Sequence, residues 1–455
     1  MIPLSEICAR AENGPIVDEG QFDKRILPTK IQELVREFDV KYNPDEPVPT
    51  DDDLADRVFE AGKKLLLETG IFCTDTNRII KFTEDEVAEA LKSAPSRITV
   101  GRGKHARELV ARKVEDKKKP WLTYGQSGMP VSEELAIPIA QSLAQEQLIE
   151  GYWSGTVSEL GGAMVRAHSP LEIMASRYEI TSTKEGFRKA GKPDLPVIGG
   201  MTGLTPEAFI AAISPGALEK GDCIITSSVN ELKTSFGTMS KVAYVKGCSD
   251  VNLMFDPTPV LRGIAGGPEG CALVSVAQEI ECILFGADLS GATTVDIMTG
   301  TAASRETMWP ANISLIGMNN NSDCIEYCYY FAAAGPCTEM LLYEAAVKTI
   351  SAVASGYDML HVPMASVAAK KDYISPLEFR LSSEVAHAVT GINRKDANIF
   401  VRELLKKYEH NLKNPPDGKS FTECMDVKTL KPTAEWLEIY GQVKKELRNI
   451  GILPE

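Results

Sequence analysis

Short apolar runs alternate with longer amphipathic stretches through most of the chain, and this alternation restricts the fold more than any other feature. It is the rhythm of repeated βα units, in which each strand is followed by a helix that packs back on the sheet. The apolar runs are nearly continuous, which suits parallel strands buried on both faces. The sequence predicts strands at Val197, Cys223 to Thr226, Val251 to Met254, Thr293 to Met298, Ile313 to Met318, Ile325 to Phe331 and Met359 to Val362.

The helices between these runs have clear ends. One begins with Pro268 in its first turn and ends at Gly286, and another opens at Gly335-Pro336 and ends at Gly356. Strand, turn and helix repeat over roughly 250 residues, which is the usual size of a TIM barrel. A doubly wound open sheet is the alternative. We favour the barrel because no GxGxxG fingerprint opens a βα unit.

The pattern predicts an α/β protein in three parts. Two amphipathic helices, Asp53 to Thr69 and Glu84 to Lys92, are expected in the first part, and one from Thr433 to Asn449 in the last. Thr83 and Glu86 have the spacing of a capping box at the start of the second helix. The parts are an N-terminal helical extension packed on the barrel (1–140), a (β/α)8 TIM barrel (141–395) and a C-terminal helical segment (396–455).

The composition limits the choice of partners. The formal net charge is -14, which disfavours nucleic acid and anionic membranes because both attract basic surfaces. The chain shows no charged and then apolar leader and no apolar run near 18 residues, so we expect a cytoplasmic protein. Its ten cysteines are scattered without a CxxC motif, and reduced thiols are expected.

Patterns that would bind a metal are weak. The five histidines form no HxH or HxxxH pair. The nearest cluster of ligands is Cys324, Cys328 and Cys337, and thiols on or beside one barrel strand are more often packing than ligands. We therefore expect no bound metal.

Several separated segments together resemble one family, the monomethylamine corrinoid methyltransferases of methanogens. They occur in the family's order and span nearly the whole chain, which makes the resemblance more specific than any single motif. It implies a TIM barrel, assembled as a homo-oligomer, that acts in methanogenesis by moving a methyl group from a small amine to the cobalt of a separate corrinoid protein. The segments are CTDTNRIIKFTEDE (Cys73 to Glu86), NELK (Asn230 to Lys233), RET (Arg305 to Thr307), AGPCTEM (Ala334 to Met340) and GKSFTECMDVKT (Gly418 to Thr429).

The chain departs from this family at one position of PDLPVIGGMT (Pro193 to Thr202). The family carries pyrrolysine in its barrel, and matching AGKP (Ala190 to Pro193) to the family's similar stretch places that residue at Ile198. Pyrrolysine has an electrophilic ring imine that captures methylamine, whereas isoleucine has no electrophile. The resemblance therefore implies a homologue that lacks pyrrolysine and cannot activate methylamine by covalent capture.

Positions around the pyrrolysine also differ. The family places a glutamate, a glutamine and a tyrosine there, and the matching residues are Asp256, Tyr329 and Phe331. A quaternary ammonium compound is already cationic and leaves as a neutral tertiary amine, so it needs no imine adduct. Aromatic ring faces attract such a cation by roughly 0.5–2 kcal/mol per contact. We therefore predict that Ile198, Tyr329 and Phe331 line a pocket for a methylated onium substrate, with Asp256 as the catalytic carboxylate.

Plainer interpretations of the same residues stay open. Tyr329 and Phe331 share one face of a strand and could fill the barrel, and Asp256 before a proline could be an ordinary turn carboxylate. Arg305 is a candidate substrate-binding residue or one half of a surface ion pair with Glu306. The chain could also be a barrel lyase, or a protein that kept the fold and senses a small amine without turnover. No cobalamin module is recognisable, so the corrinoid would come from the partner protein.

Overall fold

The computed structural model describes residues 2–199, 204–364 and 370–455, and in these ranges eight strand positions close into a barrel. The strands are parallel, and hydrogen bonds or bridges join each to the next around the ring. Val197 occupies the third position. It forms a β-bridge with Tyr152, and its carbonyl accepts a hydrogen bond from the Cys223 N–H. The others are β5 (Trp121–Gly125), β7 (Gly151–Trp153), β11 (Cys223–Thr226), β13 (Asn252–Phe255), β15 (Leu289–Ser290), β17 (Tyr327–Phe331) and β18 (Met359–Met364). The predicted TIM barrel is confirmed.

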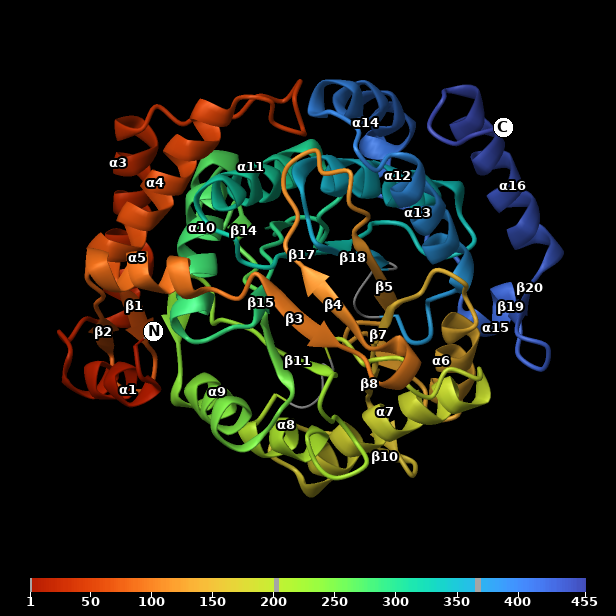
Figure 1. Cartoon of the computed structure of the whole chain (residues 1–455), viewed down its shortest axis with the longest axis horizontal. Coiled ribbons are helices and arrows are strands. Elements are labelled where there is room, and N and C mark those ends of the chain that lie inside the picture. Colours follow the sequence, from red (N-terminus) through yellow and green to blue (C-terminus); the bar gives the residue numbers. More distant parts are fainter. Residues whose placement is uncertain (1, 200–203, 365–369) are drawn as a thin grey trace.

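A ring of helices surrounds the strands (Figure 1). α10 begins with Pro268 as expected, and α12 ends at Gly356, whose φ of 101° is favourable only for glycine. α12 begins later than predicted, because Thr338 rather than Gly335 caps it. The helices are α6 (Ala136–Ala144), α7 (Pro170–Lys189), α8 (Pro206–Ala212), α9 (Phe236–Cys248), α10 (Pro268–Leu284), α11 (Arg305–Asn321), α12 (Glu339–Ser355) and α13 (Pro376–Ala388).

One predicted strand is wrong. Ile313 to Met318 lies inside α11, where all six residues are buried. A helix that is buried on every side gives a continuous apolar run, so periodicity cannot distinguish it from a buried strand. The run from Thr293 to Met298 contains only β16 (Val295–Asp296), which pairs with β14 (Val260–Leu261), and the barrel strand β15 precedes it. Gly200 to Thr202, the rest of the predicted Gly-Gly turn, lie outside the described residues.

An N-terminal layer covers one side of the barrel, at the left of Figure 1. Its central helix, α4, packs against α10 and α11. A Cβ at Gly62 of α4 would overlap Val276 of α10, so this close approach of the two helices requires glycine. The predicted capping box of Thr83 and Glu86 is present. The layer contains α1 (Leu4–Asn13), α2 (Glu19–Gln21) with a π-helical turn (Phe22–Ile26), α3 (Leu27–Glu37), α4 (Asp52–Thr69), β1 (Ile71–Cys73), β2 (Arg78–Ile80) and α5 (Glu84–Ser93), and β12 (Lys233–Thr234) joins β1.

A hairpin closes the end of the barrel where the strands begin. It consists of β3 (Arg97–Val100) and β4 (Arg107–Val110), which lie in front of the barrel in Figure 1. The Arg102 guanidinium pairs with Asp222, the residue before β11, at 3.0 Å. The opposite end, where the strands finish, is therefore where side chains from the connecting loops can meet a substrate.

The C-terminal helices pack outside α12 and α13. They are α14 (Arg394–Tyr408), the short α15 (Phe421–Cys424) and α16 (Ala434–Asn449), with β19 (Met425–Asp426) paired to β20 (Lys431–Pro432). The predicted division at 395–396 falls within the first turn of α14. The division at residue 140 falls within α6, and β5 of the barrel precedes it.

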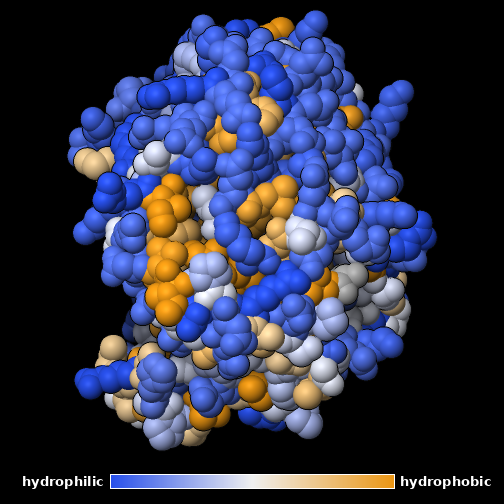
Figure 2. Space-filling model, turned by 90° about the vertical axis from the view of Figure 1, so that its left-hand side faces the viewer, coloured by the Kyte–Doolittle hydropathy of each residue, from blue (hydrophilic) through white to orange (hydrophobic). Residues whose placement is uncertain are grey.

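The surface over the N-terminal layer is mostly polar, with apolar side chains gathered toward its centre and left (Figure 2). In the described ranges, no helix combines the length and the apolar character that crossing a bilayer requires.

Candidate active site

Alternate residues of β17 form an aromatic wall inside the barrel. Tyr327, Tyr329 and Phe331 lie on one face of the strand, and their rings follow one another at centroid distances of 5.8 and 5.6 Å. Tyr330 faces outward, and its hydroxyl meets Glu344 of α12 at 3.4 Å. The alternation expected for a strand thus brings the two predicted aromatic residues together.

The wall continues across the barrel through residues that sequence reasoning missed. The indole of Trp153 lies 5.4 Å from the Tyr327 ring and stacks on the His361 imidazole at 4.5 Å. The indole N–H donates to the hydroxyl of Thr123 at 2.9 Å. Burial lowers the pKa of His361 to about 3, so its ring is neutral.

Asp256 lies directly after β13 and is 9% exposed. Its carboxylate is close enough to Tyr327 and Tyr329 to act on both through its charge. Burial raises the pKa of Asp256 to about 7, while a hydrogen bond from Ser227 and the charge of Lys241 oppose this shift. Burial raises the pKa of Asp358 and Glu378 to about 7 as well, so what distinguishes Asp256 is its place beside the aromatic wall.

The loop after Asp256 is tied to the aromatic wall. The Tyr329 hydroxyl lies 2.7 Å from Thr258 Oγ1 and donates to the Pro257 carbonyl at 3.2 Å. Asp256 and Tyr329, predicted from separate segments, therefore belong to one connected group of side chains.

Ile198 lies within the barrel but is fully buried. Its N–H donates to the Tyr152 carbonyl at 2.8 Å, and its side chain occupies the space that a Cβ at Gly151 would need. The next residue, Gly199, has a φ of 68° and packs directly against the indole of Trp153. The Ile198 side chain thus packs at Gly151, the first residue of β7, and its neighbour Gly199 contacts Trp153 of the aromatic wall. Of the three predicted pocket residues, Phe331 is partly exposed.

Arg305 stands apart from these residues. It is the first residue of α11, and its guanidinium pairs with Glu409 at 2.7 Å and donates to the Pro44 carbonyl at 2.8 Å. Glu306 pairs with Arg262 instead. Arg305 lines a surface groove of about 590 Å³, and none of Asp256, Ile198, Tyr329 and Phe331 lines it.

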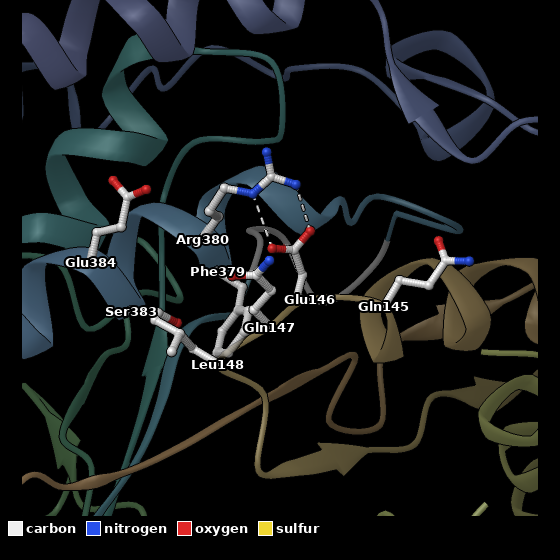
Figure 3. A pocket seen from close by; sticks show the side chains of 8 residues that line it. All are labelled: Gln145, Glu146, Gln147, Leu148, Phe379, Arg380, Ser383 and Glu384. Carbon is white, nitrogen blue, oxygen red and sulfur yellow. Dashed lines mark hydrogen bonds and ion pairs between the residues drawn. The ribbon is translucent and has the colours of Figure 1, made fainter. Parts of the chain in front are cut away.

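Another groove lies between α13 and residues 145–148, which follow α6, with a volume of about 450 Å³ (Figure 3). Its main charges are Glu146 and Arg380, which satisfy each other through two hydrogen bonds of 2.7 and 3.0 Å. None of the predicted site residues lines it. Within the described ranges, no three His, Cys, Asp or Glu side chains come close enough together to hold a metal ion.

Comparison with known proteins agrees with this architecture. The family model for monomethylamine methyltransferase MtmB matches residues 2–452. MtmB1 of Methanosarcina barkeri and MtmB of Methanosarcina mazei are each 33% identical over 447 residues, covering 98% of this chain and 97% of theirs. The crystal structure of Methanosarcina barkeri MtmB and that of a hydroxylamine MtmB complex superpose with TM-scores of 0.96 at 32% identity, covering 98% of both chains. The chain therefore belongs to the monomethylamine methyltransferase family, whose members are named as methyltransferases.

Proposed function

We propose that this protein transfers a methyl group from a methylated onium compound, such as a quaternary amine, to Co(I) of a partner corrinoid protein. Family membership supports the methyl transfer. The observation that carries the choice of donor is the aromatic wall of Tyr327, Tyr329 and Phe331 beside the buried carboxyl of Asp256.

The wall and the carboxyl suit a cation. The negative faces of aromatic rings attract an alkylated ammonium without requiring an N–H donor, and each desolvated contact contributes roughly 0.5–2 kcal/mol. A cation beside Asp256 would stabilise the ionised carboxylate and lower its pKa from about 7. Phe331, which is partly exposed, stands where a donor entering the mouth would first meet the wall.

Ile198 determines the kind of donor in this proposal. If it occupies the pyrrolysine position, no side chain there can form a covalent adduct with an amine. The nitrogen of the donor must therefore already be cationic before methyl transfer. In an onium compound the C–N bond breaks with both electrons going to nitrogen, and a neutral tertiary amine leaves. The methyl carbon forms its new bond with the electron pair of Co(I). The protein holds the donor in line and excludes water.

The methyl acceptor is a separate protein in this proposal, and it would approach the end of the barrel where the strands finish. This protein then binds the onium group, orients one methyl group toward the acceptor and releases the amine.

The product balance tests the proposed function. Purified protein, a Co(I) corrinoid and tetramethylammonium should give one trimethylamine for each methylated corrinoid formed, followed by mass spectrometry and by the corrinoid spectrum. Formation of methyl-corrinoid from monomethylamine, with none from quaternary amines or sulfonium compounds, would refute the choice of donor. No methyl-corrinoid from any donor, together with stabilisation by an amine, would favour a sensor instead.

A further inference from the structure

A second cavity lies beside the mouth of the barrel, between α7 and β8 (Thr156–Val157). Its volume is about 350 Å³, and most of its exposed lining is apolar. β8 continues beyond the barrel strand β7 and pairs with β6 (Pro130–Val131), and the hairpin of β9 (Glu159–Leu160) and β10 (Ala163–Met164) follows it. Figure 1 shows α7, β8 and β10 near one another, below and to the right of its centre. The apolar lining comes mainly from Val157, Val165, Ala167, Ala175 and Leu204.

Two buried carboxyls, Glu172 and Glu179, interrupt this apolar lining, and Glu179 has an unpaired oxygen. Glu179 of α7 is 4% exposed and lines the cavity. Its Oε1 accepts a hydrogen bond from the Val157 N–H at 2.7 Å, while its Oε2 is buried without any hydrogen-bond partner. A buried acceptor that is left unpaired is costly, so such a group in a cavity points to a ligand that would satisfy it.

The charges around Glu179 favour a cationic ligand. Glu172 also lines the cavity, but both of its oxygens are paired. Oε2 accepts hydrogen bonds from the His168 N–H at 2.8 Å and the Thr205 hydroxyl at 3.0 Å, and Oε1 accepts one from the Thr205 N–H at 3.2 Å. Burial raises the pKa of Glu179 well above its usual range, and the charge of Glu172 raises it further. The described residues that line the cavity include no Lys, Arg or His. A raised pKa favours the protonated form of Glu179 when no ligand is bound. A positive ligand at Oε2 would stabilise the ionised carboxylate, lower this pKa and pair the acceptor.

We propose that this cavity is a second binding site, which takes a small protonated alkylamine carrying at least one N–H. The N–H donates to Oε2 of Glu179, and the alkyl groups contact the apolar lining. A quaternary ammonium compound has no N–H and leaves Oε2 unsatisfied, so the cavity discriminates between the two kinds of cation. Ile198, Asp256, Tyr329 and Phe331 do not line this cavity, so it is separate from the proposed donor site.

Binding of trimethylammonium and tetramethylammonium to the full-length protein, without any corrinoid, tests this site by calorimetry. These cations differ by one methyl group, and only the first has an N–H. We expect Glu179 to contribute to the binding of trimethylammonium but not to that of tetramethylammonium, which binds at the proposed donor site. Glu179→Gln keeps an oxygen for the Val157 N–H but removes the charge, so it should weaken trimethylammonium binding at least 10-fold. Glu185→Gln is the matched control on the same helix: Glu185 is partly exposed, pairs with Arg188 and does not line the cavity, so this variant should leave both affinities unchanged.

A second variant shows whether lost trimethylammonium binding reflects the cavity itself rather than misfolding of Glu179→Gln. Ala175 is 2% exposed and lines the cavity, so Ala175→Leu should fill the space and block binding while Glu179 stays in place. Unchanged trimethylammonium binding in Glu179→Gln, or an equal loss of affinity for both cations in this variant, would overturn the proposal. Binding that is lost in Asp256→Asn but kept in Glu179→Gln would place the amine in the barrel and also overturn it. The binding assay contains no methyl acceptor, so neither result bears on the proposed methyl transfer, which the product balance tests separately.

Discussion

The hydroxyl of Tyr329 lies 2.7 Å from the hydroxyl of Thr258, two residues beyond Asp256. This contact ties the aromatic wall of β17 to the loop that follows β13. The ring and the carboxyl of the proposed donor site are therefore held in one arrangement, although more than 70 residues separate them in sequence.

Replacing Tyr329 separates the contribution of its ring from that of its hydroxyl. Tyr329→Ala should raise the KM for a quaternary ammonium donor by about 3- to 30-fold, because a cation–π contact contributes roughly 0.5–2 kcal/mol. Tyr329→Phe keeps the ring and should leave KM within a few-fold of the parent. Steady-state kinetics of methyl-corrinoid formation measure both values. Equal effects of the two substitutions would assign the role to the hydroxyl.

The pH dependence of donor binding should report the charge of Asp256. Burial raises its pKa to about 7, so the carboxylate is mostly protonated below this pH and ionised above it. The kcat/KM for a cationic donor should therefore rise between pH 6 and 8. Asp256→Asn should give a lower and flatter profile over the same range. An unchanged rise in Asp256→Asn would assign the titration to another group.

Glu344 predicts how stability depends on pH. It is fully buried, accepts hydrogen bonds from the backbone N–H groups of Ala333 and Ala334, and has its pKa raised by burial to about 8. The unfolded chain loses this proton near pH 4.5 and the folded chain near pH 8. The free energy of unfolding should therefore fall between these values, by up to about 1.4 kcal/mol per pH unit.

Glu344→Gln is the matched variant, because its amide oxygen still accepts a backbone N–H. Urea unfolding at pH 5 and at pH 8 should show a smaller decrease in this variant than in the parent. A decrease of the same size in both proteins would show that Glu344 does not titrate as described.

Arg305 allows a structural role to be distinguished from a role in substrate binding. It pairs with Glu409 at the protein surface, where such a pair contributes about 1 kcal/mol or less. Arg305→Met should reduce the free energy of unfolding by about this amount and leave KM unchanged. Glu409→Gln should have a similar effect, and the double variant should be less destabilised than the sum. A rise in KM for Arg305→Met alone would instead support contact with the substrate.

The contact between Gly151 and Ile198 can be tested by a rescue experiment. Gly151→Ala should lower the free energy of unfolding by about 1–3 kcal/mol, because the added Cβ overlaps the Ile198 side chain. Ile198→Ala should cost about 2–5 kcal/mol by leaving a cavity. The double variant should recover part of the loss, since the new methyl group enters that space. Strictly additive losses in denaturant unfolding would mean that the two side chains do not share the space.

Much of the fold was predictable because its signals are local. The helix boundaries at Pro268, Thr83 and Gly356 follow from proline, capping and glycine preferences that do not depend on the rest of the chain. The barrel strands β5, β7 and β15 were not predicted. β7 has only three residues, which is too short for alternation to be recognised, and β5 lies in a segment assigned to the helical extension.

The candidate site was only partly predictable for a related reason. Tyr329 and Phe331 lie on one five-residue strand, so their shared face follows from spacing alone. Trp153 and His361 join them only because closure of the barrel places β18 beside β17 and brings β7, two strands beyond β18, within reach of its side chains. No local pattern carries that information. Tyr327 lies two residues before Tyr329, so the same spacing also predicts its place on that face of the strand.

The most direct measurement is the initial rate of methyl-Co(III) formation from a Co(I) corrinoid with tetramethylammonium and with monomethylamine, at equal concentrations and pH. If an aliphatic residue has replaced the reactive imine, tetramethylammonium should be demethylated and monomethylamine should give no rate above the protein-free control. Turnover of monomethylamine with no turnover of tetramethylammonium would contradict the proposal that the donor must arrive already activated.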